Sequence, residues 1–284
     1  MKLGVDVLPQ FSKDTTDRNR TSPFAFTGNK FEFRMPGSSV SVANANIVLN
    51  TAVAEEVAKI YEKLSGVSEA DLKDKVMEVL RETLIEHKRV LFNGNGYTSE
   101  WVEEAAKRGL PNLKSLPDAM PYWISDESIE LFTKHHIFTK EEIHSRYDIL
   151  LENYSKSIHI ESLTMQEMVR KDLTEGIISY EKDLTKELVQ KKEVLGSVSG
   201  ALEQSIIKTL DDASAGMAAA LKKLYDDTKV AEEKEDLLEE ATYYKETILK
   251  DMDELRCYAD KAEELIPDKY LSYPTYGQML FSLR

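Results

Sequence analysis

The chain has 284 residues, and its hydrophobic content of 42% is typical of a folded protein rather than a disordered one. Its formal net charge of -14 at pH 7 argues against a general binder of nucleic acids or anionic membranes, because such proteins carry a basic surface. The single cysteine, Cys257, excludes an internal disulfide and is typical of a reducing compartment. The sequence has no apolar run long enough to cross a membrane, and residues 1–10 lack a signal-peptide core, so we expect a cytoplasmic protein.

The acidic character is not uniform along the chain. Residues 1–50 hold six Lys or Arg side chains against four Asp or Glu, so the negative charge lies downstream of them. A basic beginning on an acidic chain suggests a local site for an anion.

The first predicted regular structure is a β-hairpin. The segments "FAF" and "KFEF" flank "TGN", which is a pattern typical of two short strands joined by a turn. A strand pair of this size is not stable alone, and no later segment offers obvious partner strands. We therefore interpret the hairpin as part of a sheet whose other strands are absent.

On the second predicted strand, Lys30, Glu32 and Arg34 would share one face, with Phe31 and Phe33 on the other. One interpretation is a surface strand with a cross-strand salt bridge. The other is a carboxylate metal ligand flanked by cations that hold phosphate or carboxylate oxygens. The spacing alone does not choose between them.

After Val42 the pattern becomes helical. We predict one amphipathic helix over 43–64 and a second that begins at Ser68 and runs to about Leu91. A short helix capped by Thr98 or Ser99 follows the turn "NGNGY" and ends near Gly109. The three prolines of residues 110–122 predict a loop.

Residues 139–266 are predicted to be almost entirely helical. Thr139 and Glu142 have the spacing of a capping box, and later helical segments are expected over roughly 159–192, 194–226 and 229–266. The apolar spacing in the last segment breaks a strict heptad, which favours an antiparallel bundle over a parallel coiled coil. Small residues around Gly216 are expected to let two helices approach closely.

No other group of residues predicts a chemical site. The spacing of His135, His136 and His144 does not suit a metal site, and "FNGNGY" follows a helix, whereas phosphate-binding loops follow a strand. We interpret Cys257 as a small residue within a helix.

The stretch "RNRTSPFAFTGNKFEFR" resembles the active-site strand region of glutamine synthetases of the large type III class. The similarity continues in "ANIVLNTAVAEEV", "EEAAKRGLPNL", "HSRYDILLENY", "IESLTMQEMV" and "PTYGQMLFS", so it extends over essentially the whole chain. Type III enzymes are much longer than 284 residues. The resemblance therefore implies the C-terminal portion of such an enzyme, beginning inside its catalytic domain.

The resemblance also implies roles for four residues. Glu32 matches the carboxylate that binds a divalent metal at the terminal phosphate of the nucleotide, and Arg34 matches the arginine that stabilises the transferred phosphoryl group. Arg20 matches the arginine that contacts glutamate and phosphate. Lys30 stands near the nucleotide where smaller relatives often carry an arginine. The shorter enzymes have a further arginine at the position that is Ala25 here.

The implied reaction is the ATP-dependent ligation of glutamate and ammonia through γ-glutamyl phosphate, with Mg²⁺ or Mn²⁺ as cofactor. The implied fold is α+β and predominantly α, with remnant strands of the catalytic sheet followed by a bundle of long helices. We expect the end of the catalytic domain over 1–65, a helical domain over 66–266 and a docked tail over 267–284.

The intact enzyme is implied to be a cytoplasmic homo-oligomeric ring, with glutamate, ammonia and ATP as substrates and no nucleic-acid or membrane partner. The 284-residue chain is expected to be inactive without the upstream half of the enzyme. The alternative is a helical module that serves assembly or regulation of such an enzyme without a catalytic role.

Overall fold

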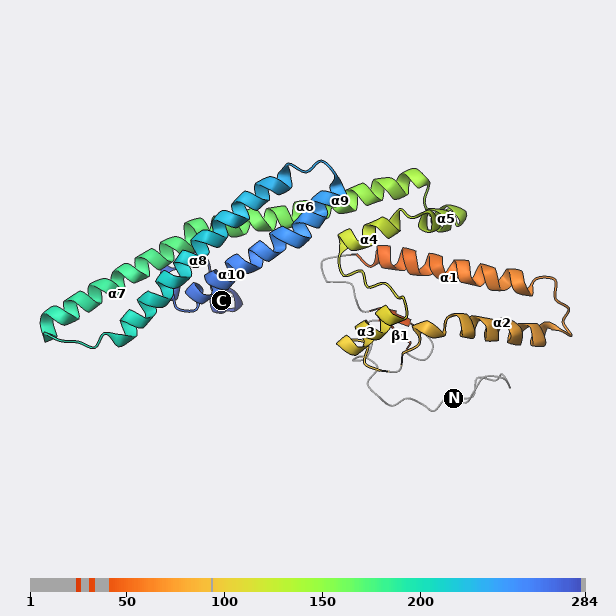
Figure 1. Cartoon of the computed structure of the whole chain (residues 1–284), viewed down its shortest axis with the longest axis horizontal. Coiled ribbons are helices and arrows are strands. Elements are labelled where there is room, and N and C mark those ends of the chain that lie inside the picture. Colours follow the sequence, from red (N-terminus) through yellow and green to blue (C-terminus); the bar gives the residue numbers. More distant parts are fainter. Residues whose placement is uncertain (1–23, 27–30, 34–40, 93, 282–284) are drawn as a thin grey trace. The chain divides into compact units, whose positions relative to one another are not determined.

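The computed structural model describes residues 24–26, 31–33, 41–92 and 94–281, with the backbone alone described for the first two ranges (Figure 1). Most of these residues are helical, which confirms the predominantly α fold class. The elements in chain order are β1 (Phe24–Phe26), β2 (Phe31–Phe33), α1 (Ala43–Leu64), α2 (Leu72–Glu86), η2 (Lys88–Val90), α3 (Ser99–Lys107), α4 (Leu116–Trp123), α5 (Asp126–Lys134), α6 (Lys140–Glu167), η3 (Met168–Leu173), α7 (Thr174–Leu195), α8 (Ala201–Glu232), α9 (Leu237–Tyr243), η4 (Tyr244–Ile248), α10 (Leu249–Glu263), η5 (Asp268–Tyr270) and α11 (Tyr276–Leu280).

The chain divides into two compact units. The first consists of residues 1–114 and 123–143, and the second of residues 115–122 and 144–284. The domain boundaries expected from the sequence stay a prediction.

In the first unit, α1 and α2 pack against each other, joined by a turn in which Gly66 has a φ of 80°. The predicted bounds of α1 are confirmed. The predicted start of the second helix is wrong: it begins at Leu72, because the Ser68 hydroxyl accepts a hydrogen bond from the Asp71 amide at 3.3 Å within a turn that precedes the helix.

Helix α5 is attached to α1 through charged side chains. Glu55 on α1 accepts hydrogen bonds from Lys134 at 2.9 Å and from His135 at 2.8 Å. The Lys134 and His135 side chains lower the pKa of Glu55, with Lys134 the larger cause. This contact joins two parts of the first unit that are about 80 residues apart in sequence.

The predicted loop over 110–122 is a second correction, because its end forms helix α4. Pro117 lies in the first turn, where a missing N–H costs the helix no hydrogen bond, and Ser115 lies just before the helix, where its hydroxyl donates to Asp118 Oδ2 at 2.7 Å. Lys245 holds α4 in place by donating to Asp118 Oδ1 at 2.6 Å. The hydrogen bond from Lys245 is the largest of the causes that lower the pKa of Asp118.

The second unit is built from long helices. The capping box at the start of α6 is confirmed, since Thr139 Oγ1 accepts a hydrogen bond from the Glu142 amide at 3.2 Å and Glu142 Oε2 accepts one from the Thr139 amide at 2.8 Å. The chain then stays helical to Leu195 through the π-helical segment η3. The expected breaks near residues 193 and 227 are wrong by several residues. They lie instead at 196–200, where Gly196 and Gly200 have positive φ, and at 233–236.

The core of the second unit lies between α8, η4 and α10, with η3 and α7 on α8 and α10. Buried side chains follow the predicted three- and four-residue steps along the last helical stretch, including Tyr244, Ile248 and Leu255 at 0–1% exposure. Because a four-residue turn joins α8 to α9 and α10, these helices run antiparallel (Figure 1). Their packing confirms the predicted antiparallel arrangement.

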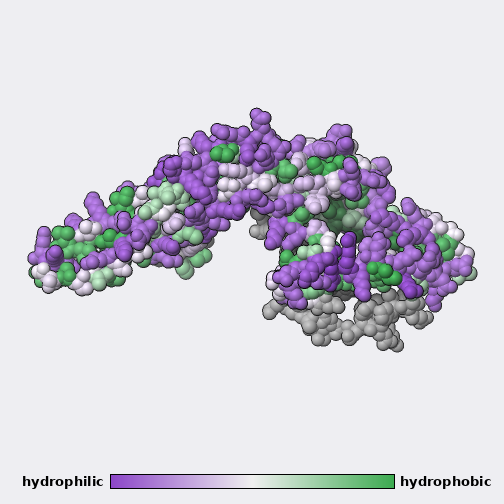
Figure 2. Space-filling view, viewed as in Figure 1, coloured by the Kyte–Doolittle hydropathy of each residue, from purple (hydrophilic) through white to green (hydrophobic). Residues whose placement is uncertain are grey.

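Gly216 permits the close approach of α8 and α10 that the small residues predicted. A Cβ atom at this position would overlap the ring of Tyr258 on α10. The end of the α7–α8 hairpin, where the two helices are connected, exposes a cluster of apolar side chains (Figure 2): Val194, Leu195 and Leu202.

Residues 268–273 pack on α7. The Tyr270 hydroxyl donates to Asp183 Oδ2 at 2.8 Å, and the ring of Tyr270 lies 5.1 Å from that of Tyr180 between centroids. Helix α11 follows with Tyr276 and Leu280 largely exposed. The tail is therefore attached to the helical unit through η5 and the residues just after it.

Candidate functional site

The site predicted from the sequence falls mostly on residues whose structure is not described. Arg20, Lys30 and Arg34 lie outside the described residues, and Glu32 lies on β2, where the backbone alone is described. The geometry of these four residues as a group stays a prediction.

The backbone does fix which residue faces Glu32 across the strand pair. Strands β1 and β2 are antiparallel, with Ala25 opposite Glu32, Phe24 opposite Phe33 and Phe26 opposite Phe31. None of the three β1 residues is charged, so within this described pair Glu32 has no charged cross-strand partner. Ala25, opposite Glu32, is also the position at which the sequence resemblance leads us to expect an arginine.

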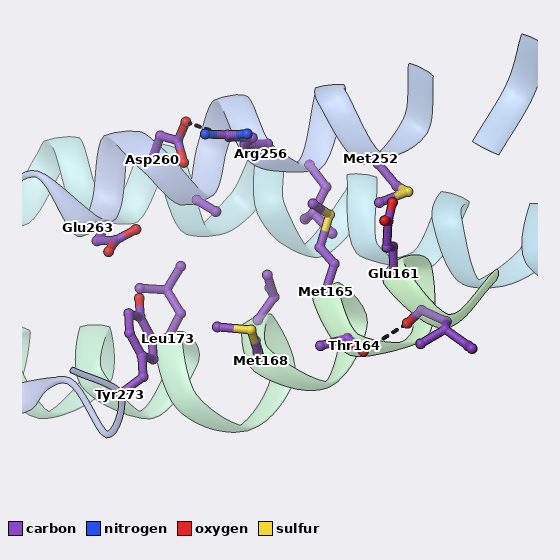
Figure 3. Close-up of a pocket in the computed structure, with 14 residues that line it drawn as sticks. Glu161, Thr164, Met165, Met168, Leu173, Met252, Arg256, Asp260, Glu263 and Tyr273 are labelled. Carbon is purple, nitrogen blue, oxygen red and sulfur yellow. Dashed lines mark hydrogen bonds and ion pairs between the residues drawn. The ribbon is translucent and has the colours of Figure 1, made fainter. Parts of the chain in front are cut away.

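The second unit contains a groove with a largely apolar lining. It has a volume of about 500 Å³ and lies between α6–η3 on one side and α10 on the other. Met165 projects from the α6–η3 side toward α10, and Met168 lines the groove on the same side (Figure 3). Its remaining apolar lining consists of Ile160, Val169, Leu173, Met252, Leu255 and Ala259.

The edge of this groove is acidic. Glu161 and Glu263 lie at its opposite ends, and Asp260 lies between them on α10 (Figure 3). Among the described residues that line it, the one guanidinium is that of Arg256, which donates to Asp260 Oδ2 at 3.2 Å. Three carboxylates therefore accompany one cation along this lining, and that cation is paired.

Tyr273 closes one end of the groove. Burial is the main cause that raises the pKa of this phenol to about 12, and the neighbouring carboxylates of Glu263 and Asp172 raise it further. Tyr273 is therefore a neutral hydrogen-bond donor at physiological pH and adds no charge to the groove.

The sequence did not predict the groove because it depends on η3. The π-helical turn over Met168–Leu173 shifts the helical register between α6 and α7, and it buries Val169 and Leu173 on the groove floor. Such turns occur frequently at functional sites. The one signal available in the sequence was the pair Met165 and Met168, since methionine is common at adaptable binding surfaces.

The described residues contain no group of three or more His, Cys, Asp or Glu side chains that could hold a metal ion. Glu32 is a carboxylate of the type that Mg²⁺ and Mn²⁺ prefer, and it would supply one ligand of a shell that these ions complete with further carboxylates, waters and phosphates. A metal at Glu32 therefore requires ligands beyond those that the described residues bring together.

Comparison with known proteins shows which family the sequence matches. Residues 75–192 match the glutamine synthetase C-terminal domain family, and this range runs from the first turns of α2 to the end of α7. The described fold and this match together define a helical domain of the glutamine synthetase class.

Three curated relatives extend the match beyond that domain. A glutamine synthetase of Butyrivibrio fibrisolvens is 69% identical over 96% of this chain and 39% of its own length. A type-3 glutamine synthetase of Dictyostelium discoideum is 36% identical over 99% of this chain and 39% of its own length. A glutamine synthetase of Bacteroides fragilis is 33% identical over 99% of this chain and 40% of its own length.

The chain belongs to the glutamine synthetase family, in its type III class. It spans about two fifths of the length of the curated relatives it matches. Among the described residues, no helix combines the length and apolar character needed to cross a membrane.

Proposed function

We propose that this chain forms part of a glutamate–ammonia ligase, which makes glutamine from glutamate, ammonia and ATP. The observation that carries the proposal is the 69% identity over 96% of the chain to a protein named glutamine synthetase. In this proposal Mg²⁺ or Mn²⁺ is the cofactor, and the enzyme is a cytoplasmic homo-oligomer.

Glu32 and the cations around it are proposed to act on the phosphoryl group. Glu32 is one ligand of the divalent metal, Arg34 stabilises the phosphoryl group during transfer, and Arg20 binds glutamate and phosphate. Lys30 contacts the nucleotide. Transfer of a phosphoryl group to the γ-carboxylate needs cations placed at the developing charge more than it needs a protein nucleophile. The absence of a charged cross-strand partner for Glu32 in β1 supports this role over that of a surface ion pair.

The position of Ala25 bears on the same proposal. Because Ala25 lies opposite Glu32, this chain has a methyl group where the shorter enzymes have a cation beside the metal ligand. We infer that another residue supplies that positive charge in this class.

The 284-residue chain alone is proposed to be inactive, since one carboxylate and three cations do not form a complete site. The test is an assay of ATP- and ammonia-dependent glutamine formation with the purified chain, alone and with the non-matching part of the Butyrivibrio fibrisolvens relative added in trans. Turnover by the chain alone would refute its inactivity. Turnover only in the mixture would support the ligase role.

A second candidate function is assembly or regulation of such an enzyme without a catalytic role. The observation that favours it is the apolar groove with its acidic edge, which lies in the helical second unit. The two functions differ in their dependence on Glu32, because an assembly module would tolerate its replacement without loss of turnover.

A further inference from the structure

The groove between α6–η3 and α10 has an unusual combination of lining and edge. Its floor is apolar and includes Val169, Leu173 and Leu255, which are buried, while Ile160 and Met168 on its walls are 63% and 40% exposed. Flexible methionine side chains can adapt to a helix laid across them. The groove therefore suits the apolar face of an amphipathic helix, and its carboxylates select one that carries cations.

The first unit presents a helix of this kind. On α2, Leu80 and Leu84 are 40% and 61% exposed, and Leu91 after η2 is 60% exposed. Residues three apart share a helix face, so Arg81 lies on the side of Leu84, and Lys88 follows just beyond the end of α2, in η2. The segment 77–91 thus exposes an apolar stripe with cations beside it.

Two carboxylates of α2 near these cations are paired with other side chains. Glu78 pairs with Lys75 at 2.8 Å and Glu82 pairs with Lys63 at 3.4 Å, both within the first unit. Within the described part of the chain, no ion pair engages Arg81 or Lys88. Among the described residues, Arg81 and Lys88 therefore remain available to carboxylates of another copy.

We propose that the groove binds residues 77–91 of a second copy of this chain. Leu80 and Leu84 occupy the apolar floor, and Arg81 on α2 and Lys88 in η2 face carboxylates toward the two ends of the groove. Glu161 and Glu263 at those ends supply the complementary charge (Figure 3). The contact is head-to-tail, because the two surfaces differ, so repetition gives a closed ring or an open chain of copies.

The test measures self-association of the full 284-residue chain by sedimentation velocity over a range of concentrations. Two charge-reversal variants are compared with the unmodified chain. The groove variant carries Glu161→Lys and Glu263→Lys, and the segment variant carries Arg81→Glu and Lys88→Glu. Each is expected to weaken self-association by about tenfold or more, because it places like charges against each other. The matched control Glu193→Lys, on the exposed side of α7, is expected to associate like the unmodified chain.

Mixing the two variants is the decisive step. The groove variant keeps an intact segment and the segment variant keeps an intact groove, so an equimolar mixture is expected to form a 1:1 dimer that grows no further. Because the substituted side chains are exposed, far-UV circular dichroism and the Tm of each variant should stay unchanged. The variant Leu84→Ser provides a second test without any change of charge, and it should weaken association as well.

Three outcomes would overturn the proposal. The unmodified chain could stay monomeric at every concentration. It could associate equally well with both sets of substitutions, which would place the contact on another surface. The mixture could fail to form the dimer, which would mean that the groove binds a different partner. None of these readouts depends on ligase activity, so failure here leaves the proposed function standing.

Discussion

Lys223 Nζ on α8 donates to Oδ1 of Asp251 on α10 at 2.6 Å and joins the two helices. The carboxyl group of Asp251 is 2% exposed, and its Oδ2 has no hydrogen-bond partner within the described residues. Burial is the largest cause acting on the pKa of Asp251 and raises it, and the negative charge of the neighbouring Asp227 acts in the same direction. The ion pair with Lys223 therefore offsets only part of the cost of burying the charge.

Replacing this carboxyl by its neutral isostere should stabilise the fold at neutral pH. Folding raises the pKa of this carboxyl, so the folded state holds the proton more tightly than the unfolded state does. The free energy of unfolding therefore falls as the pH rises from the ordinary pKa to the raised one. Asp251→Asn removes that loss, so the variant should be more stable than the unmodified chain at pH 7, with an advantage that shrinks toward pH 4. Urea unfolding across this range measures the difference.

The matched control is Asp226→Asn, which removes an exposed carboxylate paired with Lys222 on the same helix. Its effect should stay within about 0.5 kcal/mol, because exposed ion pairs contribute little. If Asp251→Asn were less stable than the unmodified chain at pH 7, the ion pair with Lys223 would outweigh burial.

The core of the second unit should depend strongly on Leu224, which has 0% exposure on α8. Leu224→Ala is expected to lower the free energy of unfolding by about 2–5 kcal/mol, because it removes buried methyl groups and leaves a cavity. Leu202→Ala on the same helix, at a position 71% exposed, should change it by about 0.5 kcal/mol or less. Equal effects in chemical denaturation would contradict the described packing of α8.

Gly216→Ala should destabilise the fold although alanine favours a helix by about 1 kcal/mol. The ring of Tyr258 occupies the space that a Cβ atom would need, so Gly216→Ala is expected to cost about 1–3 kcal/mol by overpacking. In a Tyr258→Ala background the same substitution should become neutral or stabilising. A double-mutant cycle from chemical denaturation measures this coupling, and simple additivity would show that the two residues do not compete for space.

The attachment of the tail to α7 should depend on Gly176. A Cβ atom at this position would lie 2.8 Å from the backbone oxygen of Tyr270, which cannot move without the tail moving. Gly176→Ala should therefore loosen residues 268–273 and increase the rate of proteolytic cleavage there, as measured by mass spectrometry of the fragments. Gly277→Ala, where a Cβ atom would meet only Thr275 Oγ1 at 3.8 Å, should leave the rate unchanged.

Local signals predicted much of the fold. The helix over 43–64 follows from its apolar spacing, and the start of α6 follows from the reciprocal hydrogen bonds of Thr139 and Glu142. The features that escaped prediction depend on contacts between distant residues. Helix α4 contains two prolines that locally favour a loop, and Lys245, which holds Asp118, is 127 residues away. The groove likewise requires η3 and α10 to lie side by side.

The candidate site, like the fold, could be predicted only in part from the sequence. The resemblance assigns Glu32 its role from a short motif, and the strand pairing adds that Ala25 lies opposite it. The spacing of Lys30, Glu32 and Arg34 could not distinguish a catalytic face from a solvent-exposed one, because both have the same two-residue period.

The most direct test of the ligase proposal is a chimera in which this chain replaces the matching part of the Butyrivibrio fibrisolvens glutamine synthetase. ATP- and ammonia-dependent glutamine formation is measured for the chimera, for its Glu32→Gln variant and for Glu69→Gln, an exposed control in the turn before α2. We predict an active chimera, an unchanged control and a loss of about 100-fold or more with Glu32→Gln, because the substitution removes the charge that is proposed to hold the metal at the transferred phosphate. Equal activity of the chimera and its Glu32→Gln variant would contradict the proposed role of Glu32.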